Sequence, residues 1–499
     1  MFVQQIKQNL THFLPETVLA ATFCIAILTG LIFRKNPKVV GWISFIGVMI
    51  SLFYVINQEG TSEEIFSGMI AVDPFAVFFK FLTSICTLII ILFSTYSVEV
   101  QTTVKRMAEY YALLITMTLG MFLMAGATNL LMMILAMELT SLSSYILAGY
   151  TKEASDSSEA SLKYIIYGAV STGVMLYGIS ILFGLSGAMS YTGINRALTL
   201  SAPNHAALLV ATILIVVGFG YKISAVPFHF WTPDVYEGAP ITITAFLSVA
   251  SKAAGFAMMI RFFKVVFIDT TILTVPSGVW MSLYNFEWNK LLVILSVLTM
   301  TLGNLVAVWQ DNLKRMLAYS SIAHAGYMLM GVVLLSDKGI AAVLIYFVMY
   351  LFMNLGAFYV VMLVANKTGS EDISVYRGLG HRSPIISVAM AIFLISLTGL
   401  PPTAGFVGKF YLFAAVLDAR WIWLAVVGAV NTVISIYYYA RVLRYMFLRD
   451  PEDQSGHLQV LRTEALILIL LTIPTFILGL YFTPIVDLAN ASVQMFGLH

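Results

Sequence analysis

Fourteen apolar runs, each about twenty residues or longer, occupy almost the whole of this 499-residue chain. A helix of about 20 residues crosses the roughly 30 Å hydrocarbon core of a bilayer. Only 10% of the residues are charged, whereas a soluble domain carries about 25%. The sequence therefore predicts an all-α, polytopic membrane protein with about 14 transmembrane helices. We place the spans at 14–33, 38–57, 74–96, 108–126, 129–149, 159–186, 205–225, 240–265, 290–310, 314–335, 338–366, 384–417, 421–447 and 463–490.

Positive charge is concentrated in the loops that follow odd-numbered spans. Cytoplasmic loops carry an excess of Lys and Arg, so we expect both termini on the non-cytoplasmic side. The loops on the positive side hold Arg34, Lys35, Lys38, Lys105, Arg106, Lys152, Lys314, Arg315, Lys367, Arg377, Arg382 and Arg449. The longest loops, 187–204, 266–289 and 367–383, are too short to bury a soluble core. No small-residue cleavage pattern follows the first apolar run, so we expect that run to be a retained span. The absence of a targeting extension favours a bacterial plasma membrane.

The sequence contains no recognisable cofactor site. The two cysteines, Cys24 and Cys86, both lie in apolar runs, and there is no CxxC pair for zinc or an iron–sulfur cluster. Only His324 lies well inside a span, so two helical haem ligands are not expected. No Walker or GxGxxG loop opens a helix. We therefore expect no cofactor and no redox centre in this chain.

The seventh and twelfth spans both contain helix-breaking sequence. The seventh breaks after Lys222, at Pro227, and the twelfth reads SLTGLPPTAGFVGKF, with Pro401-Pro402 followed by Lys409. Proline removes a backbone donor and clashes with the preceding turn. The breaks lie five spans apart, which fits two inverted five-helix repeats, spans 4–8 and 9–13. Interrupted helices at matching positions of two repeats are typical of an ion path, although prolines also kink membrane helices without functional consequence.

This repeat pattern suggests four segments. They are residues 1–107 for the first three spans, 108–265 for the first repeat, 290–447 for the second repeat and 463–499 for the last span.

Several charged side chains fall inside these apolar runs. Lys222, Lys252 and Lys409 lie in the seventh, eighth and twelfth spans, and Glu138 lies in the middle of the fifth. Lysine in hydrocarbon costs roughly 3 kcal/mol unless it faces a bundle interior or water. Glu138 needs a partner, and Lys163 on the next span is the expected one. Because Lys163 lies near the start of its span, reaching out to the headgroups is an alternative for it.

One acid and several lysines on separate spans suit proton transfer better than substrate binding. A buried lysine whose acidic partner moves can switch between its charged and neutral forms. His324 could relay a proton between the two repeats; the alternative is a hydrogen-bonded core histidine. A sodium site would need several oxygen ligands, and only one carboxylate lies in mid-span.

Three segments resemble the antiporter-like membrane subunits of respiratory complex I. They are HFWTPDVYEGAP…AFLSVASKAAG, NLKRMLAYSSIAHAGYMLMG and LTGLPPTAGFVGKF. The resemblance covers essentially the whole chain and is greatest to the N branch of the family, because EGAP leads to Lys252, the twelfth span carries Lys409, and no long lateral helix follows the last span. It implies a proton-translocating subunit of an NADH-quinone oxidoreductase, driven by quinone reduction elsewhere in the complex.

The resemblance also implies roles for single residues. Glu138 and Lys163 match the family's controlling ion pair, Lys222 its central proton-holding lysine, Lys252 a connecting lysine and Lys409 the terminal lysine. Asp234 and Glu237 are expected to stabilise the break. Asp311, Lys314 and Arg315 are expected to form a cytoplasmic-side cluster of ion pairs, or a positive-inside anchor.

The resemblance implies that other subunits carry the cofactors, namely flavin, iron–sulfur clusters and quinone. The expected partners are the bilayer, an M-like subunit on one side and small subunits towards the quinone site on the other, with no nucleic acid. Two alternatives remain from the sequence: a subunit of an Mrp-type sodium/proton antiporter, and a structural membrane scaffold.

Overall fold

The computed structural model describes residues 9–33, 36–103, 107–151, 154–200, 203–269, 278–283, 286–451 and 460–496. Its long helices are α2 (Leu14–Ile32), α3 (Pro37–Ile56), α4 (Pro74–Tyr96), α6 (Met107–Gly126), α7 (Leu130–Ala148), α8 (Ser155–Ser186), α10 (His205–Ile223), α13 (Lys252–Phe267), α14 (Trp288–Ala307), α15 (Leu313–Val332), α16 (Asp337–Thr368), α18 (Pro384–Thr398), α19 (Ala404–Asp418), α20 (Ile422–Leu448) and α21 (Arg462–Leu480). The shorter ones are α5 (Val98–Thr103), α9 (Tyr191–Leu200), α11 (Trp231–Gly238), α12 (Ile241–Phe246), α17 (Leu379–Arg382) and α22 (Thr483–Ala491).

The fold class predicted from the sequence is confirmed. Within the described residues, 12 helices are long and apolar enough to cross a membrane. The predicted tenth span is α15, twenty residues long, and the predicted twelfth span is divided into α18 and α19, fifteen residues each. Together these make the fourteen expected membrane crossings. Several loop cations used above to orient the chain, Arg34, Lys35, Lys105, Arg106 and Lys152, lie outside the described residues.

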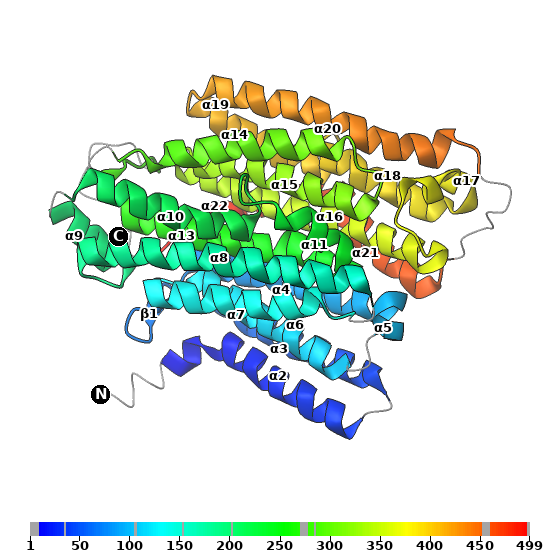
Figure 1. The fold of residues 1–499 in the computed structure, drawn as a ribbon, viewed down its shortest axis with the longest axis horizontal. Coiled ribbons are helices and arrows are strands. Elements are labelled where there is room, and N and C mark those ends of the chain that lie inside the picture. Colours follow the sequence, from blue (N-terminus) through cyan, green and yellow to red (C-terminus); the bar gives the residue numbers. More distant parts are fainter. Residues whose placement is uncertain are drawn as a thin grey trace.

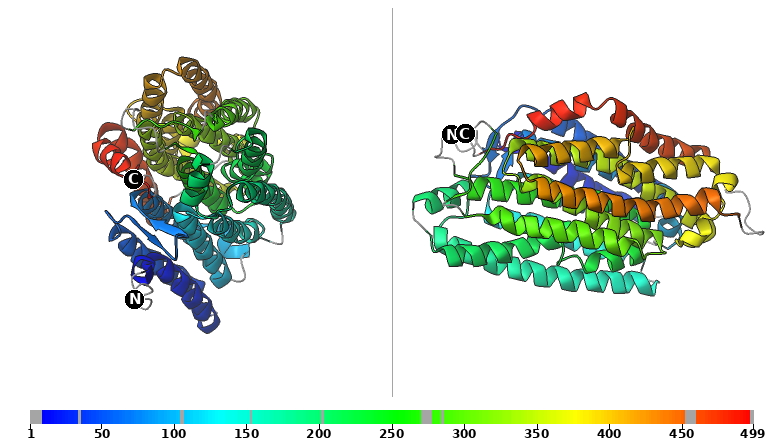
Figure 2. Two further views of the ribbon diagram at one scale, coloured as in Figure 1. Left: turned by 90° about the vertical axis from the view of Figure 1, so that its left-hand side faces the viewer. Right: turned by 90° about the horizontal axis from the view of Figure 1, so that it is seen from above.

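The long helices run side by side along a common direction (Figure 1). In this view α2 and α3 form one edge of the bundle, and α19 and α20 form the opposite edge. The end-on view of Figure 2 shows helices surrounding a central group. The central helices include α16 and the span Ile241–Phe267, whose most apolar windows are 89% and 100% buried. A helix that is apolar on all sides belongs in such a place, and the charges on these helices must therefore find partners inside the protein.

Three local features differ from the sequence predictions. The eighth span is continuous from α12 to α13, but it contains a π-helical turn, η1 (Leu247–Ser251). The predicted fourteenth span, 463–490, ends at Leu480, and α22 follows as a separate helix. A short antiparallel hairpin, β1 (Glu63–Ile65) with β2 (Ile70–Val72), precedes α4. A count of apolar residues along the chain detects none of these three features.

A fully buried ion pair joins α4 to α13. Arg261 donates from both terminal nitrogens to the carboxylate of Asp73, at 2.6 and 2.7 Å, and both side chains are 0% exposed. Asp73 also caps α4 by accepting from the backbone N–H of Ala76 at 2.8 Å, and it accepts from that of Phe496 at 2.9 Å. Burial by itself would raise the pKa of Asp73, but the charge and hydrogen bonds of Arg261 outweigh burial and lower it. The carboxylate therefore ties the C-terminal segment, α4 and the central helix together.

We predict that Asp73→Asn strongly destabilises the subunit. Removing one partner of a buried ion pair leaves the other charge uncompensated, which costs about 3–5 kcal/mol. Thermal unfolding of the purified complex, and the amount of this chain in assembled complexes on native gels, would both fall. Asp418→Asn is the matched control, because Asp418 pairs with Lys338 and both side chains are exposed, so its loss costs at most about 1 kcal/mol. Equal unfolding temperatures for the two variants would contradict this prediction.

Candidate functional site

The first helix break separates α10 from α11. Ser224 has a left-handed backbone (φ 62°), and the peptide bond between Val226 and Pro227 is cis. The backbone N–H of Val226, released from any helical bond, donates to Thr299 Oγ1 at 2.9 Å. The irregular backbone is therefore satisfied by protein groups, as it must be at membrane depth.

Lys222 lies buried in the last turn of α10, directly before this break. Its Nζ donates to Ser141 Oγ on α7 at 3.2 Å. Glu138 lies three residues before Ser141, hence on the same face of α7, and its carboxylate is close enough to act electrostatically on Lys222. Gly255 on α13 leaves room for the aliphatic part of the Lys222 side chain, since a Cβ at this position would lie 3.1 Å from Lys222 Cγ. Glu138, Ser141 and Lys222 thus form one group across α7 and α10.

The predicted ion pair between Glu138 and Lys163 is wrong. In the part of the chain that the structure describes, Lys163 pairs with Asp234 at 2.6 Å and with Glu159 at 2.8 Å. Lys163 is 37% exposed and projects from the part of α8 that packs against α11. Adjacent spans were expected to supply the partner, but the face of α8 that carries Lys163 turns towards the broken segment. The choice of partner was therefore decided by helix rotation, which the sequence does not show.

Asp234 also connects the break to the second repeat. Arg315, in the first turn of α15, donates to Asp234 Oδ1 at 2.8 Å and to Glu237 Oε2 at 2.6 Å. These contacts fix α11 against α8 and α15, which fits the structural role expected for both acids. The expected cluster of Asp311, Lys314 and Arg315 does not form internally. Instead the pairs are Asp311 with Arg441, Lys314 with Glu371, and Arg315 with Asp234 and Glu237.

Lys252 follows the π-helical turn η1 and points to α15. Its Nζ donates to the backbone carbonyl and to the Oγ of Ser321, both at 2.9 Å. Among the described residues no carboxylate forms an ion pair with it. A π-turn inserts one extra residue into a helix and is frequent at functional sites. Lys252 is therefore held by two neutral oxygens at the centre of the molecule.

His324 lies on the next turn of α15 and has two tyrosine partners. Its Nδ1 is 2.6 Å from the hydroxyl of Tyr346, and its Nε2 is 3.3 Å from that of Tyr439. The hydroxyl of Tyr439 is in turn 2.5 Å from Ser320 Oγ. The charges of both Lys252 and Lys409 act on the imidazole. His324 thus lies in a hydrogen-bonded group between the two lysines.

The second break, between α18 and α19, places the ammonium group of Lys409 at the C-terminal end of α18. Gly399 has a left-handed backbone (φ 88°), and the Pro401–Pro402 bond is cis. Lys409, on α19, donates to the backbone carbonyl of Thr398, the last residue of α18, at 2.8 Å. A helix C-terminus carries partial negative charge and favours a cation. The ammonium also lies 4.7 Å from the centre of the Tyr327 ring, so the break itself creates the site of this lysine.

Buried hydroxyls lie between these charged groups. The hydroxyl of Tyr350 and the Oδ1 atom of Asn354 are buried and have no hydrogen-bond partner within the described residues. The Tyr350 ring is 5.0 Å from that of His324. Buried polar groups of this kind usually bind ordered water. The interior thus holds ammonium, imidazole and hydroxyl groups close to one another.

Several residues of this site, and one further pair of buried charges, were not predicted from the sequence. Ser321, Tyr346 and Tyr439 gave no signal, because hydroxyl side chains are common in membrane helices. Glu16 and Lys80 form a second fully buried ion pair, with Nζ 2.6 Å from Oε1. Both lie inside apolar runs, so the criterion that singled out Lys222 would also have found them.

The described ranges contain no group of three or more His, Cys, Asp or Glu side chains that could hold a metal ion.

Comparisons with known proteins show which family this chain resembles. The model of the family described as "NADH:quinone oxidoreductase/Mrp antiporter, TM" matches residues 127–435. A protein of Chloroherpeton thalassium named NADH-quinone oxidoreductase subunit N 2 is 47% identical over 99% of this chain and 96% of its own length. The chain belongs to this antiporter-like family.

Two solved structures share the fold of this antiporter-like protein. One is a chain of respiratory complex I from Thermus thermophilus, with 28% identity, a TM-score of 0.78, and 95% of this chain and 99% of the other covered. The other is a chain of the Mrp complex from a Dietzia species, with 19% identity, a TM-score of 0.83, and 97% of each chain covered. The second likeness concerns the fold alone.

We predict that Gly399→Ala displaces Lys409. A Cβ at Gly399 would lie 2.6 Å from Lys409 Cδ, so the lysine stem must move, and the ammonium would leave the Thr398 carbonyl. Misplacing a reacting group by about 1 Å can cost up to about a hundredfold in rate, so proton transport by the assembled complex should fall steeply. Gly369→Ala is the matched control, since Gly369 also has a positive φ (70°) but nothing within 4 Å of its Cβ position. An equal loss of transport in both variants would show that backbone strain is the cause, and normal transport in Gly399→Ala would contradict the prediction.

Proposed function

We propose that this chain is a proton-translocating membrane subunit of a complex I-type NADH:quinone oxidoreductase. The observation that carries the proposal is a series of titratable side chains inside the helix bundle, in which Glu138 is half-buried, the other members are buried, and Lys222 and Lys409 lie at the two helix breaks. The series comprises Glu138, Lys222, Lys252, His324 and Lys409. It extends from α7 through the central helices to α19, which lies at an edge of the bundle (Figure 1).

The partners of the lysines support proton transfer rather than a structural role. Moving an ammonium group out of water costs several kcal/mol, and a close carboxylate partner must repay that cost if the charge is permanent. Within the described residues, the hydrogen-bond partners of Lys252 and Lys409 are all neutral oxygens, and Lys222 has a hydroxyl with Glu138 nearby. Each of them can therefore gain or lose a proton without breaking a tight ion pair. By contrast, Lys80 and Arg261 have tight carboxylate partners and are the fixed charges of the fold.

The roles follow from position. Lys222 exchanges protons under the control of Glu138, Lys252 and His324 connect the two repeats, and Lys409 delivers protons at the far end. The sequence predicted that Lys163 belongs to the proton path. Because Asp234 and Glu159 hold it, we assign it a structural role instead: it stabilises the broken segment beside that path.

We assign the redox chemistry, with its flavin, iron–sulfur and quinone cofactors, to other subunits of the assembly. An M-like subunit is the proposed neighbour on one side, with small membrane subunits on the other. The proposed location is a bacterial plasma membrane with both termini on the non-cytoplasmic side. An Mrp-type antiporter subunit is the second candidate, supported by the shared fold. The high identity to a full-length complex I-type subunit favours the first.

Proton transport by the assembled complex in vesicles tests this proposal. We expect Lys222→Ala to reduce both pumping and quinone reduction at least tenfold, because the two are coupled, while the subunit composition stays unchanged. Lys338→Ala is the control, since Lys338 is exposed and forms an ion pair at the surface. Full pumping at normal turnover in the Lys222 variant would refute a transport role for the buried series.

A further inference from the structure

The C-terminal part of α20 carries an amphipathic hollow that the proposed proton path does not use. Helix α20 has 27 residues, so it is about 40 Å long and exceeds the roughly 30 Å hydrocarbon core of a bilayer. Its final turns must therefore reach the level of the lipid headgroups. The hollow begins at this level and extends inward, with a volume of about 870 Å³. It is lined by Val433, Ile436, Tyr437, Ala440, Arg441, Leu443, Arg444, Tyr445, Phe447 and Leu448.

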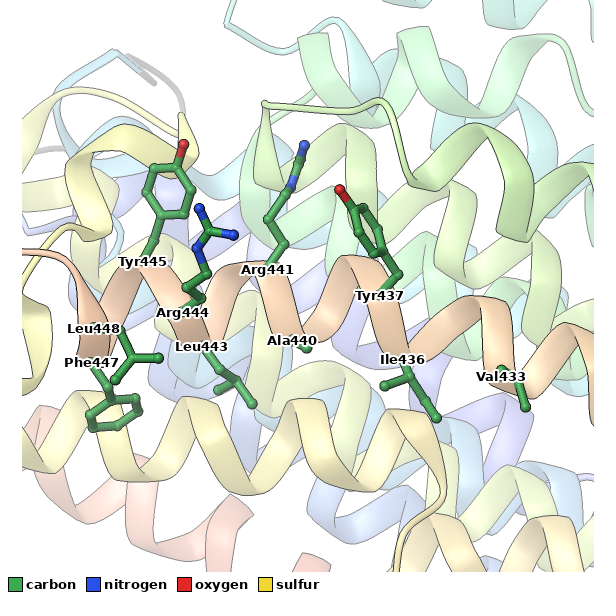
Figure 3. Close-up of a pocket in the computed structure, with 10 residues that line it drawn as sticks. All are labelled: Val433, Ile436, Tyr437, Ala440, Arg441, Leu443, Arg444, Tyr445, Phe447 and Leu448. Atoms are coloured by element: carbon green, nitrogen blue, oxygen red, sulfur yellow. The ribbon is translucent and has the colours of Figure 1, made fainter.

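The polar and apolar side chains of this hollow are separated (Figure 3). The two arginines and two tyrosines, Arg441, Arg444, Tyr437 and Tyr445, extend to one side of α20, whereas Ile436, Leu443, Phe447 and Leu448 point to the other. Tyrosine is enriched where membrane and water meet, because one end of the ring is apolar and the other polar.

Positive charge on this part of α20 is only partly compensated. Arg441 pairs with Asp311 at 3.3 Å and also donates to the carbonyl of Gln310. Arg449 lies against the ring of Tyr445, 5.8 Å from its centre. Arg444 is exposed and has no acidic partner in the described part of the chain. An arginine fork that faces the membrane surface matches the geometry of a phosphate group.

The apolar part of the hollow extends from the arginines towards the membrane centre. Val433 is eight residues before Arg441, a rise of about 12 Å, which fits within one leaflet of about 15 Å. The exposed side chains of Val426 and Val430 continue this surface. A single molecule that fits both parts has an anionic head and an apolar chain.

We propose that this hollow binds a phospholipid with an anionic headgroup. The phosphate lies against Arg444, with Arg441 and Arg449 adding charge, and one acyl chain follows α20 towards Val433. Charge complementarity at one end, combined with a largely apolar surface along the rest, favours a lipid over a protein segment, which would need polar partners along its length.

Photoreactive lipids in nanodiscs that contain the assembled complex test this site. Phosphatidylglycerol with a diazirine in its acyl chain is compared with phosphatidylcholine that carries the same chain, each as a minor component of phosphatidylcholine discs. We expect labelling of residues 433–448 by the anionic probe to exceed that by the neutral probe severalfold. One basic residue near a membrane surface is worth about a fivefold change in binding, so Arg444→Gln should reduce this preference about fivefold.

Two further variants make the outcome decisive. Arg420→Gln removes an exposed arginine just before the other end of α20 and should leave the preference unchanged. Arg444→Lys keeps the charge but loses the fork, and should give an intermediate value even if Arg444→Gln fails to assemble. Equal labelling by both probes would identify an ordinary lipid-facing surface, and absence of labelling would show that another subunit covers α20. Either result would overturn the proposal.

Discussion

The cost of an uncompensated charge in an apolar interior governs this structure. The protein meets that cost in two ways. Some buried charges have a tight carboxylate or guanidinium partner, as in the pairs Asp73–Arg261 and Glu16–Lys80. Others, Lys222, Lys252 and Lys409, have hydroxyl and carbonyl partners instead. The first kind fixes helices to one another, since breaking such a pair strands a charge. The second kind leaves a group able to exchange protons.

The helix breaks make the second kind possible. An intact helix uses its own carbonyls, whereas a helix that ends inside the membrane leaves its last carbonyls for other donors. Lys409 takes the carbonyl of Thr398 at the end of α18. The break between α10 and α11 brings Asp234 against Lys163 and Arg315, so acids in that segment anchor the irregular backbone. The same interruptions therefore serve two purposes: acids outside the spans fasten the break, and the lysines inside the spans are the groups that we propose exchange protons.

Much of the fold could be predicted from the sequence, and less of the site. The spans and both breaks followed from hydropathy and proline, because lipid forces each helix to satisfy its own backbone. Charged residues in apolar runs marked most of the series, because such residues are rare unless they have a function. The pairing of Glu138 with Lys163 was predicted wrongly, since the two helices are neighbours in sequence but Lys163 faces α11. The tyrosines around His324 gave no signal, because their meeting depends on α16 and α20, far away in the chain.

The sequence by itself determined the number of spans, the places where two of them break, and which charges enter the membrane. These are local properties: the apolar length of a run, the missing N–H of proline, and the desolvation cost of a charged side chain. The tertiary structure alone decided which charges meet. Partner choice depends on the rotation of each helix about its axis and on single insertions such as the π-turn before Lys252, and both are set by packing against helices that lie far apart in sequence.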